Sequence, residues 1–193
     1  MSIIMDNTSI ATILHEDVFV KLSDKIVELI SGDPEVRSRG SGYGIEGFQF
    51  SNEELVLESC CLCAFLVTFS FQRSFAHLGA EKTGPILDLF HKFIHKGLDK
   101  ISKEQQDRFP DILRDRFKCY YPAVTNDMEA MTGSEDALAS YKLVDIFLDN
   151  LLSDPVDAAK DLITWRFLLS SDISGLHRVL LDTYNKILKH KIA

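Results

Sequence analysis

The segment "ESCCLCAFLVTF", residues 58–69, decides the fold of this chain, because its three cysteines open a nearly unbroken apolar run. Ser51 and Glu54 stand just before it in the Ser-x-x-Glu arrangement of a capping box, which predicts that a helix begins there. A helix that is apolar on nearly all sides is typical of the centre of a fold. We therefore predict a buried central helix over about residues 52–77.

The same segment raises two alternatives, a membrane span and a metal or redox site, and the sequence disfavours both. The apolar run from residue 55 to residue 71 is shorter than the usual membrane span of about 20 residues, and it contains Glu58. Cys60 and Cys63 share a helical face, but a structural zinc ion usually takes four Cys or His ligands. We expect the thiols to be reduced and to act as small core side chains, and we expect no membrane contact.

The rest of the chain has the composition and periodicity of a helical globular protein. Its 193 residues are 46% hydrophobic and 26% charged, with only 10 Gly and 5 Pro. Apolar residues recur at steps of three and four, and no long stretch alternates with period two. We predict an all-α fold, with residues 1–193 forming a single-domain bundle of six or seven helices around the central helix.

Prolines and glycines indicate where the helices begin and end. Pro85 and Pro110 suit the first turn of a helix, where a missing backbone N–H costs nothing. Pro122 is expected to close the helix that Pro110 opens. Four glycines between residues 40 and 47 predict a Gly-rich loop over about residues 37–50.

This loop contains "GYGIEG", residues 42–47, which matches the G-x-G-x-x-G pattern of dinucleotide-binding proteins. That pattern binds a pyrophosphate only when a strand leads into it and a helix begins directly after it. Here "DPEVRSR" precedes the glycines, and the predicted helix cap comes later, at Ser51. We interpret the motif as part of a loop and predict no cofactor.

The strongest candidate for a chemical site is "DLFHKFIH", in which Asp88, His91 and His95 would stack along one side of a helix. Two imidazoles and a carboxylate could supply three metal ligands. The Glu beside the first His of zinc proteases is missing, however, and the chain contains no Glu-x-x-His of a di-iron bundle. A ligand-binding or metal-binding bundle that uses these three residues is our alternative hypothesis.

The acidic residues are distributed unevenly along the sequence. Residues 127–161 contain nine acidic and two basic residues and carry −7 of the formal net charge of −8. Spacing places Asp145 with Asp149 on one helical face, and Asp154, Asp157 and Asp161 on another. Like charges this close repel, and a basic partner would relieve the repulsion.

These observations predict a non-enzymatic interaction or regulatory module that presents its acidic face, residues 127–161, to a protein with a basic surface. No catalytic motif is present, and the net negative charge disfavours binding to nucleic acid. The first residues, "MSIIMDNTSIATIL", lack the basic region of a secretory signal, and three of the four cysteines are clustered rather than spaced as a disulfide framework. We expect a cytoplasmic location.

Overall fold

The structure is a computed structural model that describes residues 5–31, 52–96, 98–130, 141–151, 159–188 and 191–192. Its elements are α1 (Asn7–Thr12), the π-helix η1 (Ile13–Phe19), α2 (Val20–Ser31), α4 (Asn52–Ser74), the short 3₁₀ helix η2 (Ala76–Leu78), α5 (Ala80–Lys96), α6 (Lys103–Ala130), α7 (Tyr141–Leu151) and α8 (Ala159–Ile187). The described residues contain no strand, so the predicted all-α bundle is confirmed. The predicted Gly-rich loop, about residues 37–50, lies outside these ranges.

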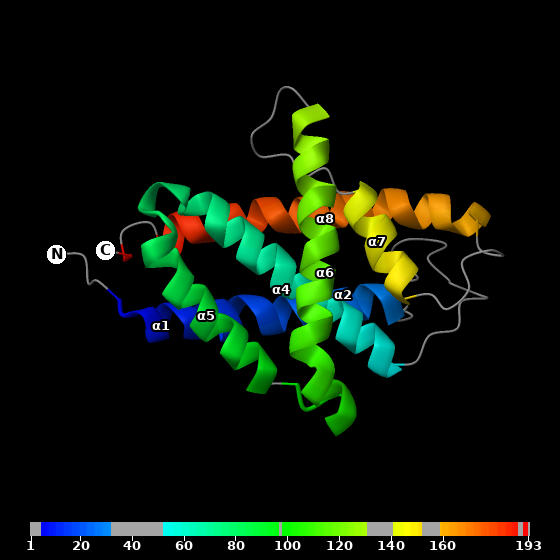
Figure 1. Ribbon diagram of the computed structural model, residues 1–193. Coiled ribbons are helices and arrows are strands. Elements are labelled where there is room, and N and C mark those ends of the chain that lie inside the picture. The colour runs from blue at the N-terminus through cyan, green and yellow to red at the C-terminus, as the bar shows by residue number, and fades with distance from the viewer. Residues whose placement is uncertain are drawn as a thin grey trace.

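Helix α4 lies among the other helices and contacts α2, α5, α6, α7 and α8. In Figure 1, α6 crosses in front of α4, while α2 and α8 lie on either side of it. Every residue from Leu57 to Phe71 is buried, which explains why the sequence there is apolar on all sides. The buried residues between Ile10 and Leu188 form one hydrophobic core.

Burial also accounts for the membrane-like character of α4. Within the described ranges, the stretch Glu53–Ser74 is long and apolar enough to cross a membrane, and 89% of its most apolar window is buried inside the fold. Three of its core side chains are the thiols of Cys60, Cys61 and Cys63. Burial raises the pKa of Cys60 to about 12 and the pKa values of the other two well above the usual value, so these thiols are protonated and unreactive at neutral pH. Cys119, on α6, is exposed.

The polar side chains of α4 determine which helix packs on which side of it. A buried polar group costs free energy unless it is hydrogen-bonded, so each one needs a partner on the helix that faces it. Three such groups pair with three different helices: Glu58 with Arg116 of α6, Thr68 with His91 of α5, and Ser70 with His177 of α8. A rotation of α4 about its axis would separate all three pairs at once.

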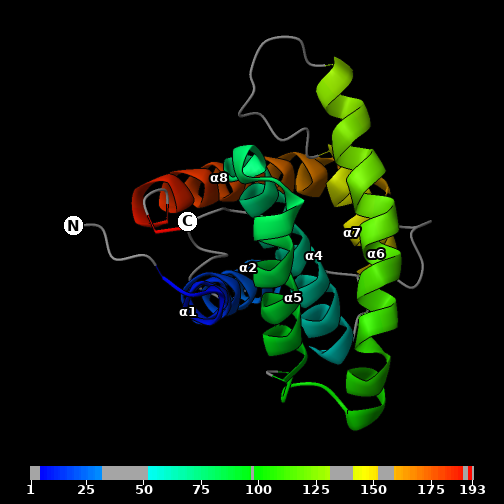
Figure 2. The ribbon, with the colours of Figure 1, turned by 60° about the vertical axis from the view of Figure 1, so that its left-hand side comes forward.

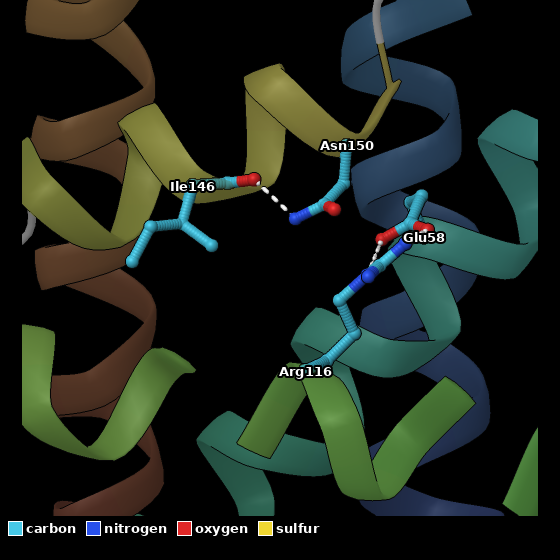
Figure 3. A network of polar contacts seen from close by, with 4 residues as sticks. All are labelled: Glu58, Arg116, Ile146 and Asn150. Carbon is cyan, nitrogen blue, oxygen red and sulfur yellow. Dashed lines mark hydrogen bonds and ion pairs between the residues drawn. The ribbon is translucent and has the colours of Figure 1, made fainter. Parts of the chain in front are cut away.

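Glu58 and Arg116 form a largely buried ion pair between α4 and α6. Nε of Arg116 donates to Oε2 of Glu58 at 2.8 Å, and Nη2 donates to Oε1 at 2.6 Å, so both carboxylate oxygens are bound (Figure 3). The Glu58 side chain is only 4% exposed, whereas that of Arg116 is 23% exposed. Close by, the side chain of Asn150 donates to the carbonyl of Ile146 within α7, at 2.6 Å.

We predict that Arg116→Met lowers the free energy of unfolding by about 3–5 kcal/mol, because it leaves the carboxylate of Glu58 buried without a partner. Glu58→Gln is expected to cost less, since Arg116 lies nearer to solvent. The double variant Glu58→Leu with Arg116→Met should recover most of the loss, because it removes both charges. Urea titration monitored by circular dichroism measures all three.

The control for this series is Lys118→Met, which breaks an exposed ion pair with Asp115 on the same helix. Exposed pairs contribute less than about 1 kcal/mol, so its effect should be small. Equal losses in Lys118→Met and Arg116→Met would contradict the assignment of a special role to the buried pair.

A π-helix interrupts the first helix and keeps its apolar side chains on one face. Helices α1, η1 and α2 run without a break, and their buried residues Ile10, Leu14, Val18, Leu22 and Ile26 follow one another at steps of four. A step of four residues is longer than one turn of an α-helix, which has 3.6 residues. It is shorter than one turn of a π-helix, which is wider because its hydrogen bonds join residues i and i+5. Combining the two types of turn keeps this row facing the core.

The prediction that Pro110 opens a helix and Pro122 closes it is wrong. Helix α6 begins at Lys103, where Ser102 caps it, and it continues through both prolines to Ala130. Glu53 fixes this start, because its side chain accepts a hydrogen bond of 2.6 Å from the backbone N–H of Ser102. Both prolines are exposed, so water can reach the carbonyl groups that each leaves without a helical partner. In α5, Pro85 likewise lies beyond the first turn, which begins at Ala80.

Candidate functional site

An open cleft with a volume of about 660 Å³ lies between α5 and α6. Figure 2 shows α5, α4 and α6 next to one another, with α4 between the other two at its lower end. The volume falls in the range of about 300–1,000 Å³ that is typical of ligand-binding sites. The cleft is lined by His91, His95, Phe109, Pro110, Leu113, Arg114, Phe117, Lys118, Tyr121 and Pro122.

The lining side chains of α6 form two parallel rows. Residues four apart lie above one another on a helix, so each row follows the helix axis. The first row, which we call the floor, consists of Phe109, Leu113, Phe117 and Tyr121, all buried or half-buried. The second row, which we call the rim, consists of Pro110, Arg114, Lys118 and Pro122, all exposed. On α5, His91 and His95 form the opposite wall and are also four residues apart.

Aromatic contacts with α4 hold the floor in place. The ring of Phe65, on α4, lies 5.6 Å from that of Phe117 and 5.2 Å from that of Tyr121, both edge to face. The hydroxyl of Tyr121 donates to the side-chain carbonyl of Gln72, also on α4, at 2.6 Å. These contacts position Phe117 and Tyr121, two of the four floor residues, against α4.

Besides the hydroxyl of Tyr121, the polar side chains that line the cleft are those of Arg114, Lys118, His91 and His95, with no carboxylate among them. Arg114 and Lys118 form exposed ion pairs with Asp111 and Asp115, at 2.7 and 2.8 Å, but neither carboxylate lines the cleft. Exposed pairs of this kind are worth less than about 1 kcal/mol. The two cations can therefore turn toward an anionic group in the cleft at little cost.

His91 connects the cleft to the core. Its Nε2 shares a hydrogen bond of 2.9 Å with the hydroxyl of Thr68, and its ring lies 5.8 Å from that of Phe117. Burial lowers the pKa of His91, and the nearby carboxylate of Asp88 opposes this shift only in part. The imidazole is consequently neutral at neutral pH.

We predict that part of the stability depends on a neutral His91. In the unfolded chain this imidazole takes up its proton at about pH 6.5, whereas in the folded chain it does so only at lower pH. The stabilising contribution is therefore complete above about pH 6.5 and is lost as the pH falls toward the lower folded pKa. The free energy of unfolding, measured by urea titration between pH 8 and pH 5, should fall less steeply in His91→Gln.

His95→Gln is the control, because His95 is exposed on the same wall. Some dependence on pH should remain in His91→Gln, since burial also lowers the pKa of His15 on η1. A slope in His91→Gln as steep as that of the wild type would show that His91 is not the titrating group.

The structure brings together two of the three residues of the predicted metal site. His91 and His95 line the cleft, whereas Asp88 is exposed and lies outside its lining. Across the described ranges, no three His, Cys, Asp or Glu side chains are grouped closely enough to hold a metal ion. A ligand-binding or metal-binding bundle that uses Asp88, His91 and His95 stays a hypothesis.

Only part of the predicted acidic face lies within the described residues. Asp145 and Asp149 are on α7, where the first is half-buried and the second is exposed. The opposite face of α7 is buried against α4, α6 and α8. Asp154 and Asp157 lie outside the described residues, and of Asp161 the structure gives only its place in the backbone of α8. Whether the five carboxylates share one surface stays a prediction.

One pair of side chains has the composition of a catalytic dyad. The hydroxyl of Ser70 lies 2.7 Å from Nδ1 of His177, which is within hydrogen-bonding distance. Both residues are completely buried, and neither lines the α5–α6 cleft. A nucleophile must reach its substrate, so this pair acts as a packing contact between α4 and α8.

The chain matches no protein-family model, no curated protein and no solved structure. Its function is therefore inferred from its own geometry. The cleft between α5 and α6 is the feature that this inference starts from.

The sequence contained a signal for the cleft that the proline interpretation obscured. Phe109, Leu113, Phe117 and Tyr121 follow one another at steps of four, which is the spacing of an apolar helical stripe. A helix that begins at Pro110 leaves Phe109 outside it, so this prediction divides the row. The spacing of His91 and His95 predicts metal ligands rather than one wall of a cleft.

Proposed function

We propose that this protein is a non-enzymatic interaction module, and that it binds a partner protein in the α5–α6 cleft. The observation that carries this proposal is the open cleft itself, whose apolar floor is accessible at the half-buried Phe117 and Tyr121 and is flanked by an exposed rim. An apolar surface that remains accessible in the folded state is typical of a binding site. Contacts with α4 position these two side chains, so they lose little conformational entropy when a partner binds.

The openness of the cleft favours a macromolecular partner over a small molecule. Sites for small ligands usually enclose 70–90% or more of the ligand surface. Here the rim residues Pro110, Arg114, Lys118 and Pro122 are all exposed, so a ligand would be covered from one side only. A partner protein supplies the second covering surface itself.

We predict that the dye anilinonaphthalene sulfonate, which is aromatic and anionic, binds in the cleft of the folded protein. His95→Trp should weaken this binding by at least about tenfold, because the larger ring fills the space above the floor. Titration calorimetry measures the affinity, and circular dichroism confirms that each variant is folded.

The matched control is Lys92→Trp, which places the same side chain on an exposed position of α5 that does not line the cleft. It should bind the dye as the wild type does. If the two variants lose the dye equally, or if the folded wild type does not bind it, the cleft is not the binding site.

A second candidate is that the acidic face, residues 127–161, binds a protein with a basic surface. The observation that favours it is the charge distribution, since this segment holds nearly all of the net charge of −8. Asp149 is exposed and accessible to a partner. The acidic face would attract a basic partner, whereas Arg114 and Lys118 at the cleft would attract an acidic one. The two proposals therefore predict different partners.

We expect a lysine-rich helical peptide to bind to the acidic face more weakly as the salt concentration rises. Replacing Asp149, Asp154, Asp157 and Asp161 with Asn should reduce its affinity, measured by fluorescence anisotropy, while His95→Trp should not. The control replaces Glu81, Asp88, Asp99 and Glu104, four exposed acids elsewhere, with their amides and changes the net charge by the same amount. Equal losses in both sets would mean that only the overall charge attracts the peptide.

A further inference from the structure

The shape of the α5–α6 cleft matches an α-helix. From Phe109 to Pro122, its lining follows α6 for about 20 Å at a rise of 1.5 Å per residue. The floor side chains repeat once per turn, so a helix laid along them can place its own apolar side chains between theirs. Apolar residues at i, i+4, i+7 and i+11 of the incoming helix would face the floor.

The charges around the cleft define the flanks of that helix. On one side of the floor are Arg114 and Lys118, and on the other side is His95, all three exposed. Lysines on the incoming helix would be repelled by Arg114 and Lys118, whereas glutamates could pair with both cations. Because no carboxylate lines the cleft, an acidic helix meets no like charge within the lining.

We infer that the cleft receives an acidic amphipathic helix of a partner protein, whose apolar stripe packs on the floor and whose carboxylates pair with Arg114 and Lys118. This inference rests on the proposed function and specifies the chemistry of the partner. The exposed pairs of the two cations with Asp111 and Asp115 give way to pairs with the partner. The new pairs are less hydrated than the old ones, because the bound helix covers the rim.

The test uses three peptides of four turns, each cross-linked to hold it helical, with the same apolar stripe and with flanking residues that are all Glu, all Gln or all Lys. Displacement of anilinonaphthalene sulfonate from the cleft reports their affinities. The Glu peptide should bind tightest, and its affinity should fall as the salt concentration rises from about 0.05 to 0.5 M. Preference for the Lys or Gln peptide would overturn the inference.

Charge reversal tests the assignment to residues. The double variant Arg114→Glu with Lys118→Glu should weaken the Glu peptide by about tenfold and improve the Lys peptide, because the rim then carries the opposite charge. Lys103→Glu with Arg108→Glu is the matched control: it also reverses two exposed cations of α6, but neither lines the cleft. Equal effects of the two changes would contradict the inference.

The outcomes separate this inference from the proposed function. If the dye binds in the cleft but laurate, a fatty-acid anion, displaces it while none of the peptides does, the cleft binds a small amphipathic anion and the partner helix is ruled out. If the dye does not bind in the cleft at all, the proposed function itself fails. If the Glu peptide displaces the dye in the wild type and in Lys92→Trp but does not bind to His95→Trp, the result supports both the proposed function and the inference.

Discussion

The carboxylate of Glu58 lies in the core, and the position of α6 against α4 depends on its neutralisation by Arg116. A buried charge without a partner is among the most costly defects that a fold can contain. Both oxygens of Glu58 are bound by one guanidinium group, which fixes the distance between the helices and also their rotation about each other. The cleft lies along the same helix, so the ion pair that positions α6 also positions the floor and the rim.

A helix with apolar side chains in every direction has no preferred orientation in a core, because any face can be buried. Three polar residues of α4 reduce this ambiguity, because each pairs with a side chain of a different helix. Thr68 selects α5 through His91, and Ser70 selects α8 through His177. These contacts make the arrangement of helices specific, whereas the apolar residues around them supply most of the driving force for folding.

The helical class could be predicted, because periodicity and an uninterrupted apolar run report directly on local structure. The prolines could not be interpreted in the same way. Whether Pro110 ends a helix depends on whether water reaches the carbonyl that it leaves unpaired, and this accessibility is a property of the packed fold. The same holds for the cleft: its floor is a local pattern, but its wall comes from α5, and only packing brings His91 and His95 opposite α6. The aspartates of the predicted acidic face have the same limit. Their spacing indicates which of them share a helical face, but it does not indicate what that face contacts.

The burial of three of the four thiols has a practical consequence. Cys119 is exposed and follows Lys118 directly, so it stands next to the rim of the cleft. A thiol-reactive fluorophore should attach there in preference to the three core cysteines, because those side chains are buried and burial raises their pKa values. The native chain thus carries its own attachment point for a spectroscopic reporter beside the cleft, without any engineered residue.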